Sequence, residues 1–324
     1  MKPLSCAPVA AALMACGTVS VRVPVMKPAE INMAPYQSVA IGGMTGNGDR
    51  PMTESLEEAL VNSQKFQVVD RQHMDKVMKE LQLSSTDLAD PNAASKLGKV
   101  ITAGAMIFGD VTQNFREFPS EEHYQDDKKV NHVLYIIKGE FYLRTTFKIV
   151  DVATGRLIIA KTYEEKRDDT NRAVDRRPQP IDRIGLERSA RATIVDRFMK
   201  AIVPHQEFMQ ANFQKDGDIP QLEGGIGWAE RGDWPKAQAT FNDAVGAAEK
   251  NVKLKSGQVA KCYWNLGLSY EYAGIYDKAS DMINKAYTLS NDKDMLNELD
   301  NIKQLQADAA RLSEQTGSGN VGAK

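Results

Sequence analysis

Residues 141–163, FYLRTTFKIVDVATGRLIIAKTY, decide the fold that is predicted for the first part of the chain. Apolar residues alternate with polar ones from Phe141 to Ile149, which is the period of a strand with one buried face. The segment DVATG at 151–155 is typical of a turn, and residues 156–163 return as a partner strand. The sequence therefore predicts an antiparallel β-hairpin here.

Further strands and helices are predicted on both sides of this hairpin. The strand-like segments before it are 38–42, 66–70 and 105–111. Four helices are predicted: one begins near Pro51, one spans 74–81, one begins near Pro91 and one spans 184–203. In the last of these, Ile184 is among the residues expected to face inward. The order β-α-β-α-α-β-β-β-α predicts an open mixed α/β sheet with covering helices. The charged segments 113–131 and 164–182 are expected to be irregular.

The last third of the chain contains an internal repeat. One set of residues recurs 42 positions later with the same offsets: Gly225, Trp228, Gly232, Trp234, Ala237, Phe241 and Ala244 match Gly267, Tyr270, Gly274, Tyr276, Ala279, Ile283 and Ala286. The pattern resembles two tetratricopeptide repeats, although their usual period is about 34 residues. The resemblance implies an all-α tetratricopeptide-repeat domain over 220–312, supported by a flanking helix, that binds protein partners and does no chemistry.

In tetratricopeptide-repeat proteins the first helix of each repeat lines the binding groove. By this resemblance, the expected partner-binding residues are Lys261, Trp264, Leu268, Glu271 and Tyr272. For Trp264 and Tyr272, packing against the neighbouring repeat is an equal alternative.

The N-terminus resembles a bacterial lipoprotein signal. Lys2 precedes an apolar run at 7–15, and the segment LMACG at 13–17 is similar to a lipobox whose thiol is acylated. Residues 1–16 are thus a predicted signal peptide with lipidation at Cys16, and the alternative is an apolar N-terminus with a chance cysteine. Residues 17–37, with three prolines, predict a tether, and 313–324 a disordered tail.

The composition excludes several classes of function. Lys and Arg number 41 against 43 Asp and Glu, so the net charge of −2 gives no field to hold nucleic acid. Three cysteines are too few for a disulfide framework and lack metal-ligand spacing. No apolar run reaches the roughly 18–20 residues of a membrane-spanning helix.

Two stretches invite a chemical role, and neither fits one. The glycine-rich segment 42–48 lacks the Lys of a P-loop and the third glycine of a dinucleotide motif. The arginines within 167–191 are interleaved with acidic residues, which is typical of a solvated face. The sequence predicts no catalytic residue, no metal site and no cofactor.

The α/β part, expected to span 38–204, resembles the CsgG family of curli-secretion lipoproteins. The matching segments, which cover about residues 37–203, are LVNS at 60–63, FQVVDRQ at 66–72, KLG at 96–98, GDV at 109–111 and IVDVATGRL at 149–157. A similar resemblance extends to outer-membrane lipoproteins that activate penicillin-binding proteins. It implies a non-enzymatic bacterial envelope lipoprotein with a three-layer α/β domain.

Three functional hypotheses follow. The leading one is a periplasmic adaptor or assembly factor, anchored in the outer membrane by lipid, whose repeats bind other envelope proteins. The alternative is a CsgG-type oligomeric secretion channel for curli-like or other exported protein, but the segments 113–140 and 162–185 are too charged to resemble its membrane hairpins. An enzyme would require a site that this sequence does not display. Gly17 after Cys16 favours the outer membrane.

Overall fold

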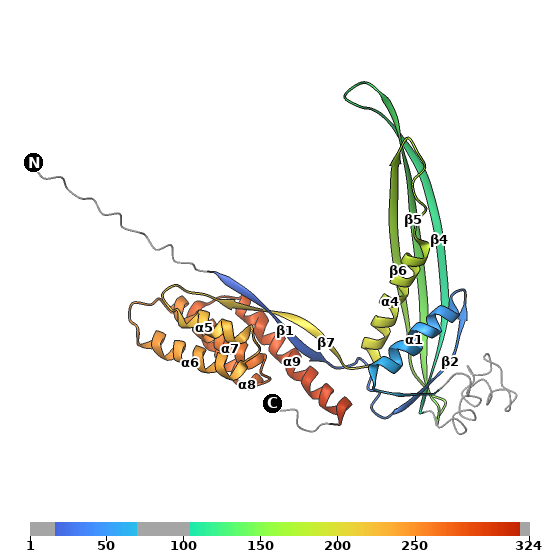
Figure 1. Ribbon diagram of the computed structural model, residues 1–324. Coiled ribbons are helices and arrows are strands. Elements are labelled where there is room, and N and C mark those ends of the chain that lie inside the picture. The colour runs from blue at the N-terminus through green and yellow to red at the C-terminus, as the bar shows by residue number, and fades with distance from the viewer. Residues whose placement is uncertain (1–16, 70–103, 318–324) are drawn as a thin grey trace, which may run out of the picture. The chain divides into compact units, whose positions relative to one another are not determined.

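The computed structural model of the chain describes residues 17–69 and 104–317 (Figure 1). They divide into two compact units: unit 2 is Ala29–Val203, and unit 1 combines the segments before and after it. The predicted signal peptide, with Cys16, and the predicted helices at 74–81 and after Pro91 lie outside the described residues. No helix within the two described ranges is long and apolar enough to cross a membrane.

Unit 2 is built on a mixed sheet with the strand order β3-β2-β4-β5-β6. β2 pairs in parallel with β3 and β4, whereas β4, β5 and β6 are antiparallel. The strands are β2 (Ser38–Gly46), β3 (Gln67–Val69), β4 (Ala105–Gln125), β5 (Asn131–Asp151) and β6 (Leu157–Val174). The predicted α/β fold with its central hairpin is therefore confirmed.

In the described part of unit 2, the helices α1 (Asp49–Ser63) and α4 (Arg183–Ile202) cover the sheet. They pack against each other and α4 also packs on β5 and β6. In the core beneath them the rings of Phe147 and Phe198 stack with centroids 4.1 Å apart. The expected inward position of Ile184 is wrong, since this residue in the first turn of α4 is 68% exposed.

The charged segments that were expected to be irregular form the outer halves of three strands. β4 and β5 stay paired as far as Gln125 and Asn131, and β6 follows to Val174. Figure 1 shows the three strands continuing past the ends of α1 and α4. We call this extension the arm (residues 116–138 and 168–174). Its side chains are mostly exposed or half-buried, and cross-strand ion pairs such as Lys166–Glu140 (3.0 Å) lie at its base.

Unit 1 begins with a strand where the sequence predicted a tether. β1 (Thr18–Lys27) pairs antiparallel with β7 (His205–Gln214), from Thr18 opposite Gln214 to Lys27 opposite His205. We call this pair the ribbon. Its inward side chains include Val21, Val23, Ala211 and Phe213, which enter the hydrophobic core of unit 1. Burial of these side chains favours a strand over a solvated tether.

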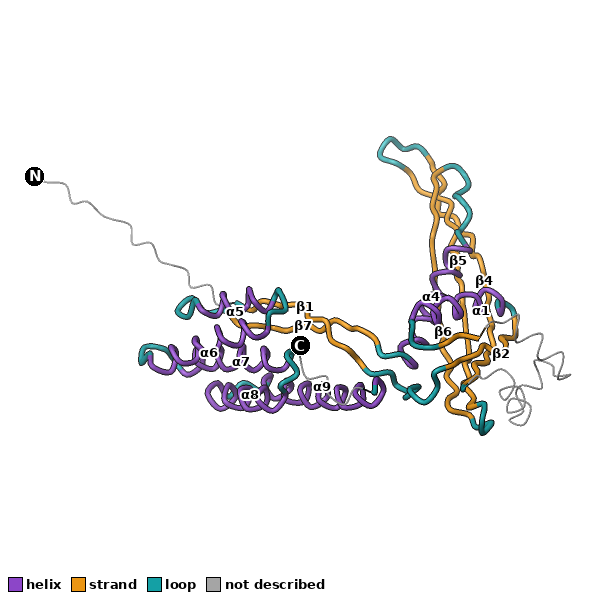
Figure 2. The backbone as a smooth tube through the Cα atoms, turned by 60° about the horizontal axis from the view of Figure 1, so that its bottom comes forward, coloured by secondary structure: helices purple, strands orange, loops and turns teal. Residues whose placement is uncertain are grey.

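The rest of unit 1 is helical. Its helices are α5 (Gln221–Ala229), α6 (Trp234–Lys250), α7 (Ser256–Glu271), α8 (Tyr276–Ser290) and α9 (Asp294–Thr316). Figure 2 shows them as successive helical turns beside the ribbon. An ion pair of 2.9 Å between Lys27 and Asp308 ties β1 to α9. The helix α9 runs through residues 313–316, which were expected to be disordered.

The two hairpins α5–α6 and α7–α8 repeat each other in detail. A Cβ on Gly225 would overlap the ring of Phe241, and one on Gly267 would lie 2.6 Å from Cδ1 of Ile283. Gly232 and Gly274 each lie three residues beyond the first helix of their hairpin, with positive φ angles of 71° and 76°. Because both glycines of each hairpin serve the same close approach or turn, the internal repeat read from the sequence is a structural repeat.

Candidate partner-binding site

The helix α7 carries four of the five predicted partner-binding residues, with Tyr272 directly after its end, and is buried along most of its length. It packs against α6, α8 and β7. At its start the Lys255 amide donates to Oε1 of Gln258 (3.0 Å), and the Gln258 amide donates to the carbonyl oxygen of Lys255 (2.9 Å). Capping satisfies backbone groups that would otherwise be orphaned at a helix end. Because β7 packs on α7, the side of α7 that would line a tetratricopeptide groove is covered by the ribbon of the same chain.

Two α7 side chains hold the backbone of β7. Nε1 of Trp264 donates to the carbonyl oxygen of Asn212 at 2.8 Å. The Asn265 amide makes two bonds of 2.8 Å with Gln214, accepting from its backbone N–H and donating to its carbonyl oxygen. Asn265 therefore satisfies both backbone groups of one residue, as a neighbouring strand would. Asn265 was not among the predicted site residues.

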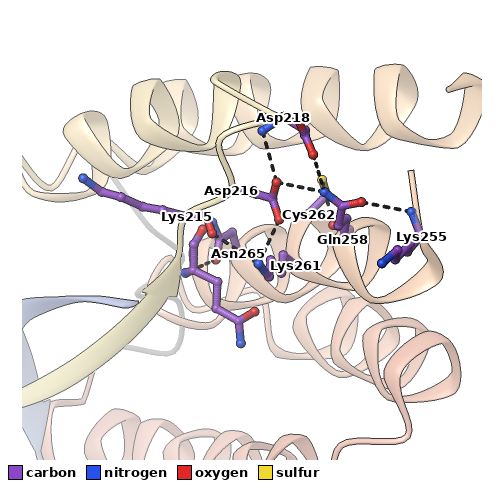
Figure 3. A network of polar contacts seen from close by, with 9 residues as sticks. Lys215, Asp216, Asp218, Lys255, Gln258, Lys261, Cys262 and Asn265 are labelled. Atoms are coloured by element: carbon purple, nitrogen blue, oxygen red, sulfur yellow. Dashed lines mark hydrogen bonds and ion pairs between the residues drawn. The ribbon is translucent and has the colours of Figure 1, made fainter. Parts of the chain in front are cut away.

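A polar network continues this contact beyond the end of β7 (Figure 3). Nζ of Lys261 lies 2.8 Å from Oδ2 of Asp216. Nε2 of Gln258 donates to Oδ1 of Asp216 (3.0 Å) and to Oδ2 of Asp218 (2.8 Å). Burial by itself would raise the pKa of Asp216, but hydrogen bonds from Lys261 and Gln258 outweigh it and lower that pKa below its ordinary value. The carboxylate of Asp216 thus stays charged inside the contact.

The remaining predicted residues lie in the interior. Leu268 is buried in the core of unit 1. Tyr272 stacks on Trp234 of the first hairpin, with ring centroids 5.9 Å apart, and burial raises its pKa. Glu271 is only 1% exposed, and neither of its carboxylate oxygens has a hydrogen-bond partner. Burial, and then the charge of Glu298, raise the pKa of Glu271 to about 10, so at neutral pH it is an uncharged acid.

The structure thus gives each of the five residues an internal environment. Lys261 contacts Asp216 just after β7, and Trp264 contacts β7 itself. Leu268 and Glu271 lie further along α7, and Tyr272 directly follows it. For Tyr272, the packing alternative matches the observed stack on the first hairpin; for Trp264, the packing partner is β7. Binding of a partner protein by these residues stays a prediction.

Within residues 17–69 and 104–317, no three His, Cys, Asp or Glu side chains are grouped so as to hold a metal ion. The one cysteine in these ranges, Cys262, is buried, and burial raises the pKa of its thiol to about 12.

Comparisons with solved structures and with protein families give matches to parts of this chain. No curated protein sequence matches the chain. Similar solved structures include the LpoB C-terminal domain from Salmonella enterica, which is 17% identical over 42% of this chain and 87% of that one, with a TM-score of 0.27. A minor lipoprotein from Acinetobacter baumannii is 10% identical over 51% and 91% of the two chains, with a TM-score of 0.25. The NMR structure of E. coli LpoB is 16% identical over 55% and 77%, with a TM-score of 0.26.

The comparison with protein families gives a match to part of this chain. It begins at the end of β1 and runs through β2, α1 and β3 into the outer half of β4. The resemblance inferred from the sequence is therefore confirmed over this part of the chain: residues 27–121 match the family of the curli production assembly/transport component CsgG.

Proposed function

We propose that this chain is a non-enzymatic lipoprotein of the bacterial envelope that acts in the periplasm as an adaptor or assembly factor. The observation that carries the proposal is the match of residues 27–121 to an assembly and transport component. The same chain adds a unit of repeated helical hairpins, an architecture that other proteins use to present extended binding surfaces. The partners in this proposal are other envelope proteins.

The partner site on α7 is part of the proposal, with a condition set by the contacts of that helix. Trp264 and Asn265 bind backbone groups of Asn212 and Gln214, and Lys261 binds Asp216. A partner would therefore reach the groove side of α7 only after residues 212–218 have moved away from it. A partner that leaves this contact intact would bind the outer surface of the helices instead.

Cross-linking in living cells tests the adaptor role and locates the surface. A photo-reactive residue would replace Val252, which is 97% exposed between α6 and α7, and in a second variant Ile184 of unit 2. We expect a discrete adduct with another envelope protein from position 252, while position 184 serves as the matched exposed control. Adducts only between copies of this chain, from both positions, would contradict the adaptor role.

The lipid anchor is proposed at Cys16. Replacement Cys16→Ala should abolish labelling by a radioactive fatty acid and move the protein from the membrane fraction to the soluble fraction. A membrane-bound, unlabelled variant would contradict anchoring through this residue.

The alternative, an oligomeric secretion channel, is not favoured because charged side chains lie on both faces of the arm. The strand register places Glu121 and Asp169 on one face, and Lys138 and Arg172 on the other. A face in contact with lipid would carry a high cost for such charges. The native mass of the full chain in mild detergent separates the two roles: we expect a monomer or dimer, and a stable ring of many subunits would favour the channel.

A further inference from the structure

The outer end of the arm, together with the two residues that follow it, contains a histidine between two carboxylates. We call this region (residues 124–134 and 173–176) the tip. His132 is the second residue of β5. Its Nδ1 lies 2.6 Å from Oδ2 of Asp175, which follows β6, and its Nε2 lies 3.6 Å from Oδ2 of Asp126, in the turn between β4 and β5. The ring also stacks on Tyr124 of β4, with centroids 5.5 Å apart. One side chain therefore contacts every strand end at the tip.

Both carboxylates are held in place by the backbone. Oδ1 of Asp126 accepts from the amides of Lys128 (3.0 Å) and Val130 (2.7 Å), which shapes the turn. Oδ1 of Asp175 accepts from the amide of Val133 (2.9 Å). Asp175 has a φ of 55°, in the left-handed region that costs energy for a residue other than glycine. Because the backbone already positions both carboxylates, the protonation state of the imidazole decides how many hydrogen bonds it donates to them.

A neutral imidazole donates from one nitrogen only. When Nδ1 carries the proton and donates to Asp175, the lone pair of Nε2 faces the carboxylate of Asp126, which is unfavourable. A protonated imidazole donates from both nitrogens and lies between two negative charges. The hydrogen bond to Asp175 is the main cause that raises the pKa of His132 above 6.5; burial opposes it, and Asp126 adds to it.

The other charged groups around the tip do not compete for this position. Tyr124 lies on β4 and stacks on the ring. Glu122 precedes it on β4, and Asp127, Lys128 and Lys129 belong to the turn; all four are exposed to solvent. Arg176 follows Asp175 and is also exposed. The two aspartates are therefore the charges that act directly on His132.

We propose that His132 is a proton-dependent latch that ties the β4–β5 turn to the end of β6 and so orders the tip of the arm. Its pKa is raised by folding, so the latch is fully closed below the ordinary value of 6.5 and opens as the pH rises through the raised value. The ordered tip presents Tyr124, Val130 and Val174, which are 44%, 49% and 43% exposed. The inference depends neither on the anchor nor on the partner proposed above.

Hydrogen exchange on the full-length chain tests the latch. The amides of Lys128, Val130 and Val133 bond to the two carboxylates and report its closure. After correction for intrinsic rates, we expect protection at pH 6 to exceed that at pH 8 by about tenfold for each pKa unit of the shift in His132. Equal protection at the two pH values would overturn the proposal.

Two variants separate the latch from other effects of pH. His132→Gln keeps a donor for Asp175 but cannot titrate, so the ratio of protection between pH 6 and pH 8 should fall to one. His123→Gln is the matched control, because His123 lies on the same arm, is 69% exposed and pairs with Glu121 instead. It should retain the ratio of the unmodified chain. Retention of that ratio by His132→Gln would also overturn the proposal, while unchanged exchange in α4 shows that unit 2 remains folded.

Discussion

The two helical hairpins of unit 1 have the same packing positions but differ in what surrounds them. Ala237 and Ala279, and likewise Phe241 and Ile283, are fully buried at equivalent positions. The first helix of each hairpin differs in length: α5 has 9 residues and α7 has 16. The additional turns of α7 carry Gln258 and Lys261, which bind Asp216 just after β7. Trp264 and Asn265, which bind β7 itself, lie in the part of α7 that is equivalent to α5. The added length therefore serves the polar network at Asp216.

A second difference lies at the end of the first helices. Ala229, 2% exposed, is the equivalent of Glu271, because the two positions are 42 residues apart. The first hairpin thus has a small apolar residue where the second buries an acid without a hydrogen-bond partner. Burying a polar group without a partner costs stability, so the second hairpin carries a penalty that the first does not.

The contact between α7 and the ribbon gives the largest expected effect. Asp216→Ala would remove the buried carboxylate that pairs with Nζ of Lys261 and accepts from Gln258, and should lower the free energy of unfolding by about 3 kcal/mol or more. All three tryptophans belong to unit 1, so urea unfolding followed by tryptophan fluorescence reports on this unit. Asp218→Ala, at an exposed position of the same network, is the control and should cost less than about 1 kcal/mol. Equal losses would show that the ion pair contributes no more than the side-chain hydrogen bond of Asp218 and would contradict this prediction.

Removal of the buried acid Glu271 should raise the free energy of unfolding instead of lowering it. The pKa of Glu271 is raised from 4.5 to about 10, so folding at pH 7 requires uptake of a proton. Over the 2.5 units between 4.5 and 7 this costs about 3 kcal/mol, and Glu271→Gln should recover it. The gain should shrink as the pH falls towards 4.5, where the unfolded chain is protonated as well.

Unfolding of both proteins at pH 7 and pH 4.5 measures this gain. Ala229→Glu places an acid at the equivalent site of the first hairpin and should destabilise the unit at pH 7. If Glu271→Gln instead lowers stability at pH 7, the carboxylate has a stabilising partner and the comparison of the hairpins must be revised.

The glycines of close approach should show a smaller and graded effect. Both Gly225→Ala and Gly267→Ala force a methyl group against the second helix of the hairpin, which typically costs about 1–3 kcal/mol. The cost should be larger for Gly225, because its neighbour is the rigid ring of Phe241, whereas Ile283 can rotate its terminal methyl group away. Thermal unfolding of the two variants measures the order, and a larger loss for Gly267→Ala would contradict it.

The smallest effect concerns two lysines at equivalent positions. Nζ of Lys236 lies 4.5 Å from the ring centroid of Trp228, and Nζ of Lys278 lies 5.4 Å from that of Tyr270. Replacement of each by Met keeps the aliphatic stem and removes the charge, at an expected cost of about 0.5 kcal/mol. Lys236→Met should cost slightly more, because Lys236 also pairs with Asp233 at 2.6 Å. Identical urea midpoints for Lys236→Met and the unmodified chain would show that the contact between Lys236 and Trp228 does not stabilise the first hairpin, which would contradict the prediction.

Periodicity predicted the elements that bury one face. The hairpin of β5 and β6, the helix α4 and the internal repeat all follow from regular spacing of apolar residues. The strand β1 was missed although Val19, Val21, Val23 and Val25 alternate, because nearby prolines favoured a tether. The alternating valines are typical of a strand with one buried face, but only the pairing with β7 shows what covers that face.

The arm and the contact on α7 could not be found in the same way. Both faces of the arm are largely open to solvent, so its side chains show no apolar period, and strand pairing alone extends it. Asn265 is a fully buried polar residue within an apolar helical run. Such a residue requires a hydrogen-bonding partner, but the partner, the backbone of Gln214, is far away in sequence.

The discontinuity of unit 1 has a consequence for the order of folding. Lys27 and His205 are the last pair of the ribbon, and just beyond them the amide of Ile31 donates to the carbonyl oxygen of Ala201 at 3.0 Å. The ends of unit 2 are thus adjacent, so once it has folded it connects β1 to β7 as a tight turn connects a hairpin. The entropic cost of closing the long loop between β1 and β7 is then part of the folding of unit 2, so that pairing of the two strands adds little further cost. We expect unit 2 to fold first and to act as the nucleation point from which the ribbon, and then the helices on it, assemble.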